Sequence, residues 1–247
     1  MQQRPVKTKA TVAARKPPGR ATAAWGNALP SQEEKDELRR SSILRAAAQC
    51  FNRSGFHGTS MEDIAQRLGV TKPALYRYVN NKHDVLAACF DLVMDMSFRH
   101  LELGVANGRN GLDKLRRTIS GYLAELIGDL GHPVVILEEG ALLPEQLRGL
   151  IRRRDQLERG YRELIEEGKR DGSVIPCNSK LAVFTIFGAM NWVPKWYRPN
   201  GEWSPEFIAE SLVQLITRAI DAHPQPLRDY ANGAPGGHPK PLETSHA

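Results

Sequence analysis

Three observations predict an all-α fold for this chain of 247 residues. Apolar residues recur with a period near 3.6 in most segments between residues 39 and 222. Strand-like alternation of apolar and polar residues is scarce. Capping residues and Gly or Pro breaks separate the periodic segments, as expected for consecutive helices. The length allows one or two domains with buried cores.

The first helix is predicted from about residue 39 to residue 51. Its apolar side chains fall on one face: Ile43, Leu44, Ala47, Ala48 and Phe51. The segment 52–58 then contains Asn, Ser and two glycines, which end the helix.

A second helix is predicted for residues 60–68, with Met61, Ile64, Ala65 and Leu68 on one side. Two capping-box registers are open, Thr59-x-x-Glu62 and Ser60-x-x-Asp63. Gly69 is expected to end this helix with a positive φ, and Val70 to cover apolar surface under the turn.

The third helix is expected to be short, with Thr71 as its cap and Pro73 in its first turn. If Leu75 and Val79 anchor it to the core, Pro73, Tyr76 and Arg77 point outward, with Lys72 and Ala74 at the edges. Such a small, cationic and aromatic face suits a DNA major groove, because it fits sterically and its donors reach phosphates or purine edges.

This stretch resembles the TetR family of bacterial transcriptional regulators. The matching residues are Gly55-Phe56, Thr59-Ser60, Asp63-Ile64-Ala65, Leu68-Gly69-Val70, Leu75-Tyr76-Arg77-Tyr78-Val79, Asn81-Lys82 and Val85-Leu86. The resemblance implies a homodimer that binds a palindromic double-stranded DNA operator and is released by a small-molecule effector.

We expect phosphate contacts from Thr59, Ser60, Tyr76 and Lys82, and base contacts mainly from the third helix. The full set of expected DNA-contacting residues is Thr59, Ser60, Thr71, Lys72, Pro73, Ala74, Tyr76, Arg77 and Lys82.

The net charge of +6 is concentrated at the N-terminal end. Residues 1–30 contain six Lys or Arg and no acidic residue, and residues 38–83 contain eight Lys or Arg against Glu62 and Asp63. This distribution predicts a polyanionic partner. Residues 1–37 are expected to be a disordered basic arm. The arm either follows phosphates or a minor groove, or is a dispensable solvated extension.

Neither a secretory signal nor an apolar run long enough to cross a membrane is present, so we expect a cytoplasmic protein, associated with the nucleoid when bound to DNA. Cys50, Cys89 and Cys177 are odd in number and widely separated, which favours buried thiols over a disulfide framework or a metal site.

The remaining helices are predicted from periodicity and breaks. A helix capped by Asn81 should run to about Leu103, and the break at 107–111 is the expected domain boundary. The later apolar segments cover 112–130, 134–143, 145–170, 181–193 and 205–222. The predicted division is therefore 1–37 arm, 38–106 DNA-binding domain with its linker helix, 107–222 ligand-binding and dimerisation domain, and 223–247 disordered tail.

Arg154 falls near the middle of the apolar stripe of segment 145–170, whereas Arg153 points elsewhere. A cationic side chain on the inward face of a helix is costly unless it pairs with an anion or lines a water-filled cavity. Arg154 is therefore either a structural partner of Glu158, Glu138 or Glu139, or a ligand contact.

Segment 181–193 is apolar all round, which predicts burial on one face and contact with a partner chain on another. Together with the last helix it would form a four-helix dimer interface, as the TetR resemblance implies. The expected interface residues are Phe184, Gly188, Leu212, Leu215, Ile216 and Ile220.

Residues 188–206 also resemble the branch of the TetR family that senses acyl-CoA thioesters in fatty-acid or steroid catabolism. The matching residues are Gly188-Ala189-Met190-Asn191-Trp192, Lys195-Trp196-Tyr197-Arg198-Pro199, Gly201 and Ser204-Pro205-Glu206. No cofactor is expected, but the effector implied is an acyl-CoA. An alternative effector is a hydrophobic non-CoA molecule from efflux or aromatic catabolism.

An acyl-CoA needs an apolar tunnel and cations for its phosphates, for which Arg153, Arg154, Lys195 and Arg198 are candidates. The expected ligand-binding residues are Arg154, Arg153, Tyr161, Phe187, Asn191, Trp192 and Trp196.

None of the common catalytic motifs is present: no Gly-x-Ser-x-Gly, no P-loop and no His-Glu-x-x-His. The sequence therefore favours a regulator over an enzyme. A constitutive architectural DNA-binding protein, in which the basic arm dominates binding, is an interpretation of a different class.

Overall fold

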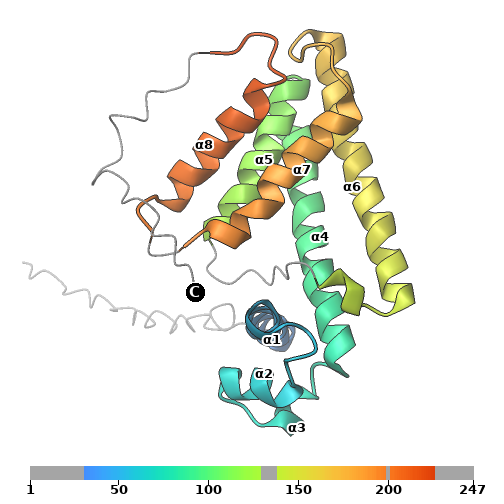
Figure 1. Cartoon of the computed structure of the whole chain (residues 1–247), viewed down its shortest axis with the longest axis vertical. Helices are drawn as coiled ribbons and strands as arrows, with labels where there is room; N and C mark the ends of the chain where they lie inside the picture. The colour runs from blue at the N-terminus through green and yellow to red at the C-terminus, as the bar shows by residue number, and fades with distance from the viewer. Residues whose placement is uncertain (1–30, 129–137, 199–200, 226–247) are drawn as a thin grey trace, which may run out of the picture. The chain divides into compact units, whose positions relative to one another are not determined.

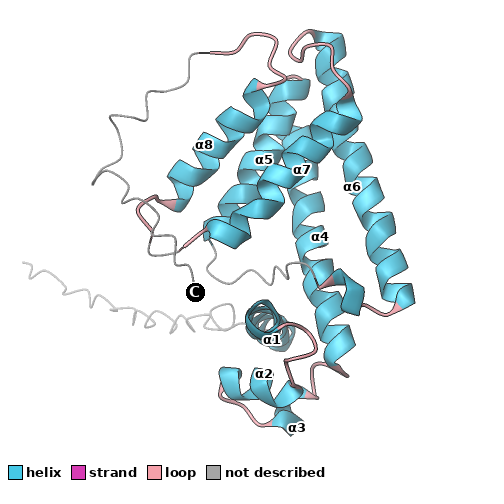
Figure 2. Ribbon diagram, in the orientation of Figure 1, coloured by secondary structure: helices cyan, strands magenta, loops and turns pink. Residues whose placement is uncertain are grey.

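The computed structural model of the protein describes residues 31–128, 138–198 and 201–225. Within these ranges the chain is helical, and its only strand-like pairing is an isolated antiparallel bridge between Val174 and Asp221 (Figure 2). The all-α prediction is confirmed. None of the described helices is long and apolar enough to cross a membrane. The elements are α1 (Gln32–Ser54), α2 (Met61–Leu68), α3 (Lys72–Leu75), α4 (Lys82–Asn107), α5 (Gly111–Gly128), the 3₁₀ helix η2 (Glu139–Ala141), α6 (Pro144–Asp171), α7 (Ser179–Trp196) and α8 (Pro205–Arg218).

The chain divides into two compact units, residues 1–37 and 38–247. The described part of the first unit is the beginning of α1. There the Ser31 Oγ accepts a hydrogen bond from the Glu34 N–H, and the Glu34 carboxylate accepts one from the Ser31 N–H at 2.6 Å. This reciprocal capping explains why the helix begins at Gln32. Residues 32–37 are therefore helical, and the prediction that the disordered arm reaches residue 37 is wrong for them.

The apolar face predicted for the first helix forms the core of the helix-turn-helix. Ala47 is fully buried, and Ile43, Leu44, Ala48 and Phe51 are at most 5% exposed. Their packing removes a continuous apolar stripe from water, which stabilises α1 against α2 and α3.

The second helix begins with the Ser60 capping box. The Ser60 Oγ accepts from the Asp63 N–H at 3.1 Å, and the Asp63 carboxylate accepts from the Ser60 N–H at 2.7 Å. Gly69 ends the helix with φ +67°, as predicted. Val70 is 44% exposed, so the expectation that it covers apolar surface under the turn is wrong.

The third helix is a single α-helical turn anchored by Leu75, which is 1% exposed. Thr71 occupies the N-cap position, but its side chain makes no capping hydrogen bond, contrary to expectation. The carbonyl of Leu75 accepts from the N–H groups of Tyr78 and Val79, which continues the helical path as turns.

Helix α4 was expected to be a linker, but it is a core element that contacts both ends of the fold (Figure 1). Near its start, the Cys89 Sγ donates to the Leu44 carbonyl of α1 at 3.5 Å. Further along it packs against α5 and α6. At Gly104 the approach to α5 is so close that an added Cβ would lie 2.8 Å from the Lys114 carbonyl. The turn after α4 lies where the domain boundary was predicted, yet residues 38–247 form one compact unit.

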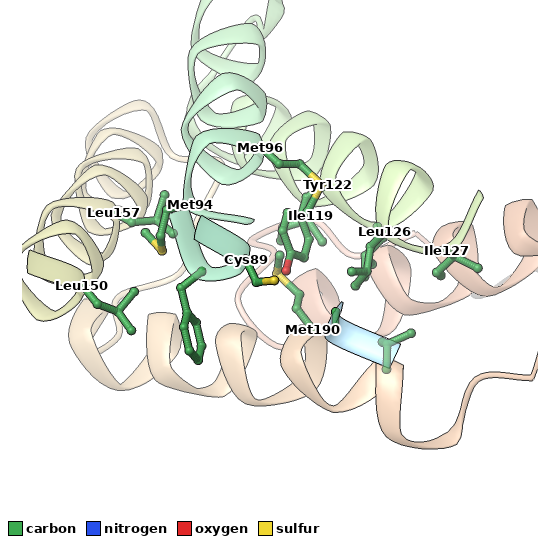
Figure 3. Close-up of a cluster of buried hydrophobic side chains, with 14 of the residues drawn as sticks. Cys89, Met94, Met96, Ile119, Tyr122, Leu126, Ile127, Leu150, Leu157 and Met190 are labelled. Atoms are coloured by element: carbon green, nitrogen blue, oxygen red, sulfur yellow. The ribbon is translucent and has the colours of Figure 1, made fainter. Parts of the chain in front are cut away.

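The later helices bury one continuous core with α4. Figure 3 shows its labelled side chains, which come from four helices: Cys89, Met94 and Met96 of α4, Ile119, Tyr122, Leu126 and Ile127 of α5, Leu150 and Leu157 of α6, and Met190 of α7. The end of the predicted segment 112–130, the first four residues of segment 134–143 and nearly all of the predicted tail lie outside the described residues.

The three cysteines are free. Cys89 is fully buried, which raises the pKa of its thiol, whereas Cys50 and Cys177 are only half-buried. The prediction of buried thiols is therefore correct in full for Cys89 alone. Among the described residues, no His, Cys, Asp and Glu side chains are grouped closely enough to hold a metal ion.

Candidate functional site

The outer surface of α3 presents the side chains expected to read DNA. Lys72, Pro73, Tyr76 and Arg77 are exposed, and Ala74 is half-buried at the edge. The anchoring of Leu75 in the core produces this orientation, because residues one to two positions away on a helix point to the other side. The structure therefore brings together one aromatic and two cationic side chains on a surface that no described segment covers.

Lys72 already has an acidic neighbour. Its ammonium group forms an ion pair with Glu62 of α2, and both side chains are exposed to solvent. The hydrogen bond to Lys72 lowers the pKa of Glu62, and the same bond raises the pKa of Lys72. An exposed pair of this kind is weak and readily exchanges for a phosphate or a base.

Two of the expected phosphate contacts are instead used inside the fold. Thr59 is 3% exposed, and its Oγ1 donates to the Gly55 carbonyl at 2.8 Å. The Lys82 ammonium donates to the carbonyls of Phe56 and Thr59, both at 2.7 Å. Lys82 also lies 4.3 Å from the centroid of the Phe56 ring. Thr59 and Lys82 therefore stabilise the turn between α1 and α2. Because the Thr59 hydroxyl is shielded, the prediction that Thr59 contacts DNA is wrong.

Ser60 and Thr71 remain at the edge of this surface. Both are exposed, but the Ser60 hydroxyl is occupied by its capping box while the Thr71 hydroxyl makes no capping bond. Thr71 is thus the hydroxyl best placed to bind a phosphate oxygen.

A second candidate site is a cavity of about 490 Å³ enclosed by α4, α6 and α7, with contributions from α5 and η2. Its wall is mainly apolar and aromatic. The lining residues are Phe90, Val93, Met94, Ser97, Tyr122, Glu139, Leu150, Arg154, Asp155, Leu157, Glu158, Tyr161, Lys180, Phe184, Phe187, Gly188, Met190, Asn191, Trp192 and Pro194.

Five of the seven residues expected to bind ligand line this cavity: Arg154, Tyr161, Phe187, Asn191 and Trp192. Phe184 and Gly188, expected at a dimer interface, line it as well. Arg153 faces a neighbouring cleft, and Trp196 lines neither space. The sequence prediction missed all the lining side chains of α4, because that helix was interpreted as a linker, and it also missed several of α5, α6 and α7.

The arginines of α6 do not both point as the helical wheel predicted. The Arg154 side chain is 43% exposed and forms an ion pair with Glu139, one of the partners considered for it, and it also lines the cavity. Arg153, expected to point elsewhere, reaches back to α4 and donates to Asp91 at 3.0 Å and to Asp95 at 2.5 Å. The two acceptors lie one turn apart, so Arg153 bridges α6 to α4.

Two tyrosines belong to the buried wall of the cavity. Burial raises the pKa of Tyr122 to about 12 and also raises the pKa of Tyr161. The Tyr161 ring meets Phe187 edge to face, with ring centroids 4.9 Å apart. Both hydroxyls are therefore neutral near pH 7, and the rings contribute apolar surface to the cavity.

The neighbouring cleft lies between α4 and α6 and has a volume of about 640 Å³. It carries three arginines, Arg152, Arg153 and Arg159, and two carboxylates, Asp91 and Asp155. Phe90, Leu150 and Asp155 line both the cleft and the cavity. The two spaces therefore adjoin each other along shared walls.

Large apolar side chains are exposed on α7 and α8. Leu181 is 63%, Phe184 52%, Trp192 60% and Leu215 57% exposed. Leu212 and Ile216 are half-buried against the core. Ile220 is only 7% exposed, so its expected contact with a partner chain is wrong because its own chain covers it. An apolar surface of this extent is typical of an interaction site.

Comparison with known families decides the class of this protein. Residues 43–89 match a model described as bacterial regulatory proteins of the tetR family, and residues 108–220 match one described as the tetracyclin repressor-like C-terminal domain. The first match ends within α4 and the second begins at the turn between α4 and α5, so residues 90–107 lie between the two. The chain belongs to the TetR family. It is a helix-turn-helix transcriptional regulator, a class of DNA-binding proteins rather than enzymes.

Relatives of this TetR-family chain include regulators of lipid metabolism. The fatty acid metabolism regulator protein of Bacillus subtilis is 24% identical over 72% of this chain and 93% of its own length. The transcriptional repressor KstR2 of Mycolicibacterium smegmatis is 22% identical over 77% of this chain and 95% of its own.

Solved TetR-family structures share the fold. AibR, in complex with isovaleryl coenzyme A and operator DNA, is 26% identical, with a TM-score of 0.62 over 72% of this chain and 97% of its own. The regulator PfmR of Thermus thermophilus is 28% identical, with a TM-score of 0.63 over 71% of this chain and 97% of its own.

Proposed function

We propose that this protein is a homodimeric repressor that binds a palindromic operator and is released from it when an acyl-CoA thioester enters the cavity. The observation that carries the proposal is the course of α4. Its first residue, Lys82, is bonded to the helix-turn-helix, and its middle residues, Phe90 to Ser97, form a wall of the cavity. A ligand that displaces this wall displaces the DNA-reading head with it.

The chemistry of the cavity supports an apolar ligand. Its wall contains Phe90, Met94, Leu157, Phe187 and Trp192, which favour an acyl chain or a fused apolar ring system over a polar metabolite. The regulator of fatty acid metabolism and the complex of AibR with isovaleryl coenzyme A point to the same chemistry. A hydrophobic effector without coenzyme A is the alternative within this class.

The phosphates of such a thioester do not belong in the cavity. Its charged side chains are three acids, Glu139, Asp155 and Glu158, against the two cations Arg154 and Lys180. The adjoining cleft has the opposite balance, because Arg152, Arg153 and Arg159 exceed its two carboxylates. We therefore place the acyl portion in the cavity and the phosphates against Arg152 and Arg159, for which no ion pair exists among the described residues.

On DNA, Arg77, Lys72, Pro73 and Ala74 would contact base edges, and Thr71, Ser60 and Tyr76 would position the phosphates. A two-fold dimer formed through α7 and α8 would place two heads on successive half-sites, which accounts for a palindromic operator. Such a regulator acts in the cytoplasm, on the nucleoid. The basic residues 1–30, which lie outside the described residues, would add phosphate contacts.

Native mass spectrometry of the purified protein with a panel of acyl-CoA thioesters tests the effector assignment. We expect a dimer that gains one ligand per subunit, and Arg152→Glu combined with Arg159→Glu should abolish binding of coenzyme A itself. Arg148→Glu, an exposed α6 residue outside both spaces, is the matched control. A dimer that ignores every thioester would remove the acyl-CoA assignment.

A further inference from the structure

Glu158 lines the cavity, and one of its carboxylate oxygens has no hydrogen-bond partner among the described residues. It lies on α6, and its side chain is only 13% exposed. Its Oε1 is closed off from solvent and accepts no hydrogen bond there. The Arg162 guanidinium forms an ion pair with that oxygen, but its Nε lies 3.8 Å away, which is beyond hydrogen-bonding distance.

The other cations of the cavity do not compensate for this charge. Arg154, one turn before Glu158, is paired with Glu139. The Lys180 ammonium lies 5.7 Å from the centroid of the Phe184 ring. The immediate neighbours on α6, Leu157 and Tyr161, are buried. A shielded carboxylate oxygen with no donor destabilises the protein unless something else satisfies it.

We infer that Glu158 accepts a hydrogen bond from the effector, and that the effector therefore carries a hydroxyl group on its otherwise apolar body. This inference rests on the proposed function, in which the cavity is the effector site. The terminal torsion of a Glu side chain is broad, so a small rotation can turn the carboxylate toward a ligand hydroxyl.

The surroundings of Glu158 favour a hydroxyl on the acyl portion over the amide groups of pantetheine. Tyr161 and Phe187 form an apolar wall beside it, and a polar chain with several donors and acceptors would leave most of them unsatisfied there. A single hydroxyl on an apolar body matches the one shielded carboxylate oxygen that lacks a hydrogen bond among the described residues lining the cavity.

Isothermal titration calorimetry with decanoyl-CoA and its 2-, 3- and 10-hydroxy derivatives tests the inference. We expect wild type to bind at least one hydroxy derivative about tenfold more tightly than decanoyl-CoA, as for a hydrogen bond to a charged group. Glu158→Leu should abolish this preference, and Glu158→Gln, which keeps an acceptor, should retain part of it. Glu163→Gln, an exposed α6 control, should retain all of it.

The ratio of the affinities for the hydroxy derivatives and for decanoyl-CoA separates a ligand-binding role of Glu158 from a structural one. If Glu158→Leu weakens all four thioesters by the same factor, or if wild type prefers none of the hydroxy derivatives, the inference is wrong.

A second pair of probes distinguishes this inference from the acyl-CoA assignment. Octan-1-ol and heptyl methyl ether have similar size, but only the alcohol donates a hydrogen bond. If no thioester binds while the alcohol stabilises wild type more than the ether does, and Glu158→Leu removes that difference, the acyl-CoA assignment fails and the role of Glu158 stands. If neither thioesters nor the alcohol bind, both fail.

Discussion

At the scale of single residues, Lys82 joins α4 to the turn that positions the recognition helix. Its ammonium group donates to two backbone carbonyls and lies over the Phe56 ring. Hydrogen bonds to a charged group contribute more than neutral ones, and removal of the ammonium leaves two carbonyls without their donor.

We therefore expect Lys82→Met to lower the free energy of unfolding by about 1–3 kcal/mol, the range for a charge-assisted bond whose acceptors lose their partner. Urea unfolding followed by circular dichroism measures this change. Lys195→Met, an exposed residue at the end of α7, is the control and should leave the midpoint unchanged. An unaffected Lys82→Met midpoint would show that the bonds contribute nothing to stability.

Arg77 has no such structural role, since it is exposed in the turn directly after α3. Arg77→Ala should leave stability unchanged and weaken operator binding by about 1–3 kcal/mol, with relaxed preference at one base pair of each half-site. Fluorescence anisotropy on an operator selected from random DNA, and on its single-base variants, measures both effects. A uniform loss of affinity on every sequence would instead indicate a phosphate contact.

Periodicity could predict which residues lie in the core but not which polar groups bond to each other. Leu75 and Ile64 were predicted correctly because a helical face alone determines their burial. The hydrogen bonds of Thr59 and Lys82 were not predicted, because their partners are backbone carbonyls of the turn between α1 and α2. The position of these carbonyls depends on tertiary packing. The same limit applies to Arg153, whose acceptors lie on another helix, α4.

At the scale of elements, the close approach of α4 and α5 depends on Gly104. A Cβ at this position would overlap the Thr118 Oγ1 and lie 2.8 Å from the Lys114 carbonyl oxygen, so backbone as well as side chain would have to move. The two helices form the central contact between the DNA-reading head and the later helices.

Gly104→Ala should therefore destabilise the protein by about 1–3 kcal/mol through overpacking, despite the better helix propensity of Ala. Gly188→Ala in α7 is the matched control, because an added Cβ there meets nothing within 4 Å. This control should be neutral or slightly stabilising. Equal melting temperatures for the two variants would contradict the close packing of α4 on α5.

The helix boundaries were predictable to within a few residues, because capping residues and glycines mark them locally. The role of α4 in the cavity could not be predicted from the sequence. Its second apolar face can line a core or a cavity equally well, and it consists of Phe90, Val93 and Met94. Only the arrangement of α6 and α7 around it identifies the cavity.

At the scale of the whole molecule, the exposed apolar side chains of α7 and α8 predict self-association. Leu215→Asp should convert the dimer to a monomer, because it places a charge in a surface that would otherwise be buried between two chains. Sedimentation velocity measures the change. Leu103→Asp, a control on α4 with a similar exposed fraction of 51%, should leave the dimer intact. A Leu215→Asp variant that stays dimeric would exclude α8 from the interface.

The central claim is that a ligand in the cavity controls operator binding through α4. The most direct measurement is the affinity of wild type and Val93→Trp for the selected operator, with and without the thioester that binds most tightly. We expect the thioester to weaken operator binding by wild type by about 5- to 150-fold, the usual range of allosteric coupling. Val93→Trp, which fills the cavity from α4, should bind or respond to the thioester much less. If the thioester binds wild type but leaves its operator affinity unchanged, or if Val93→Trp responds as wild type does, the cavity does not control DNA binding.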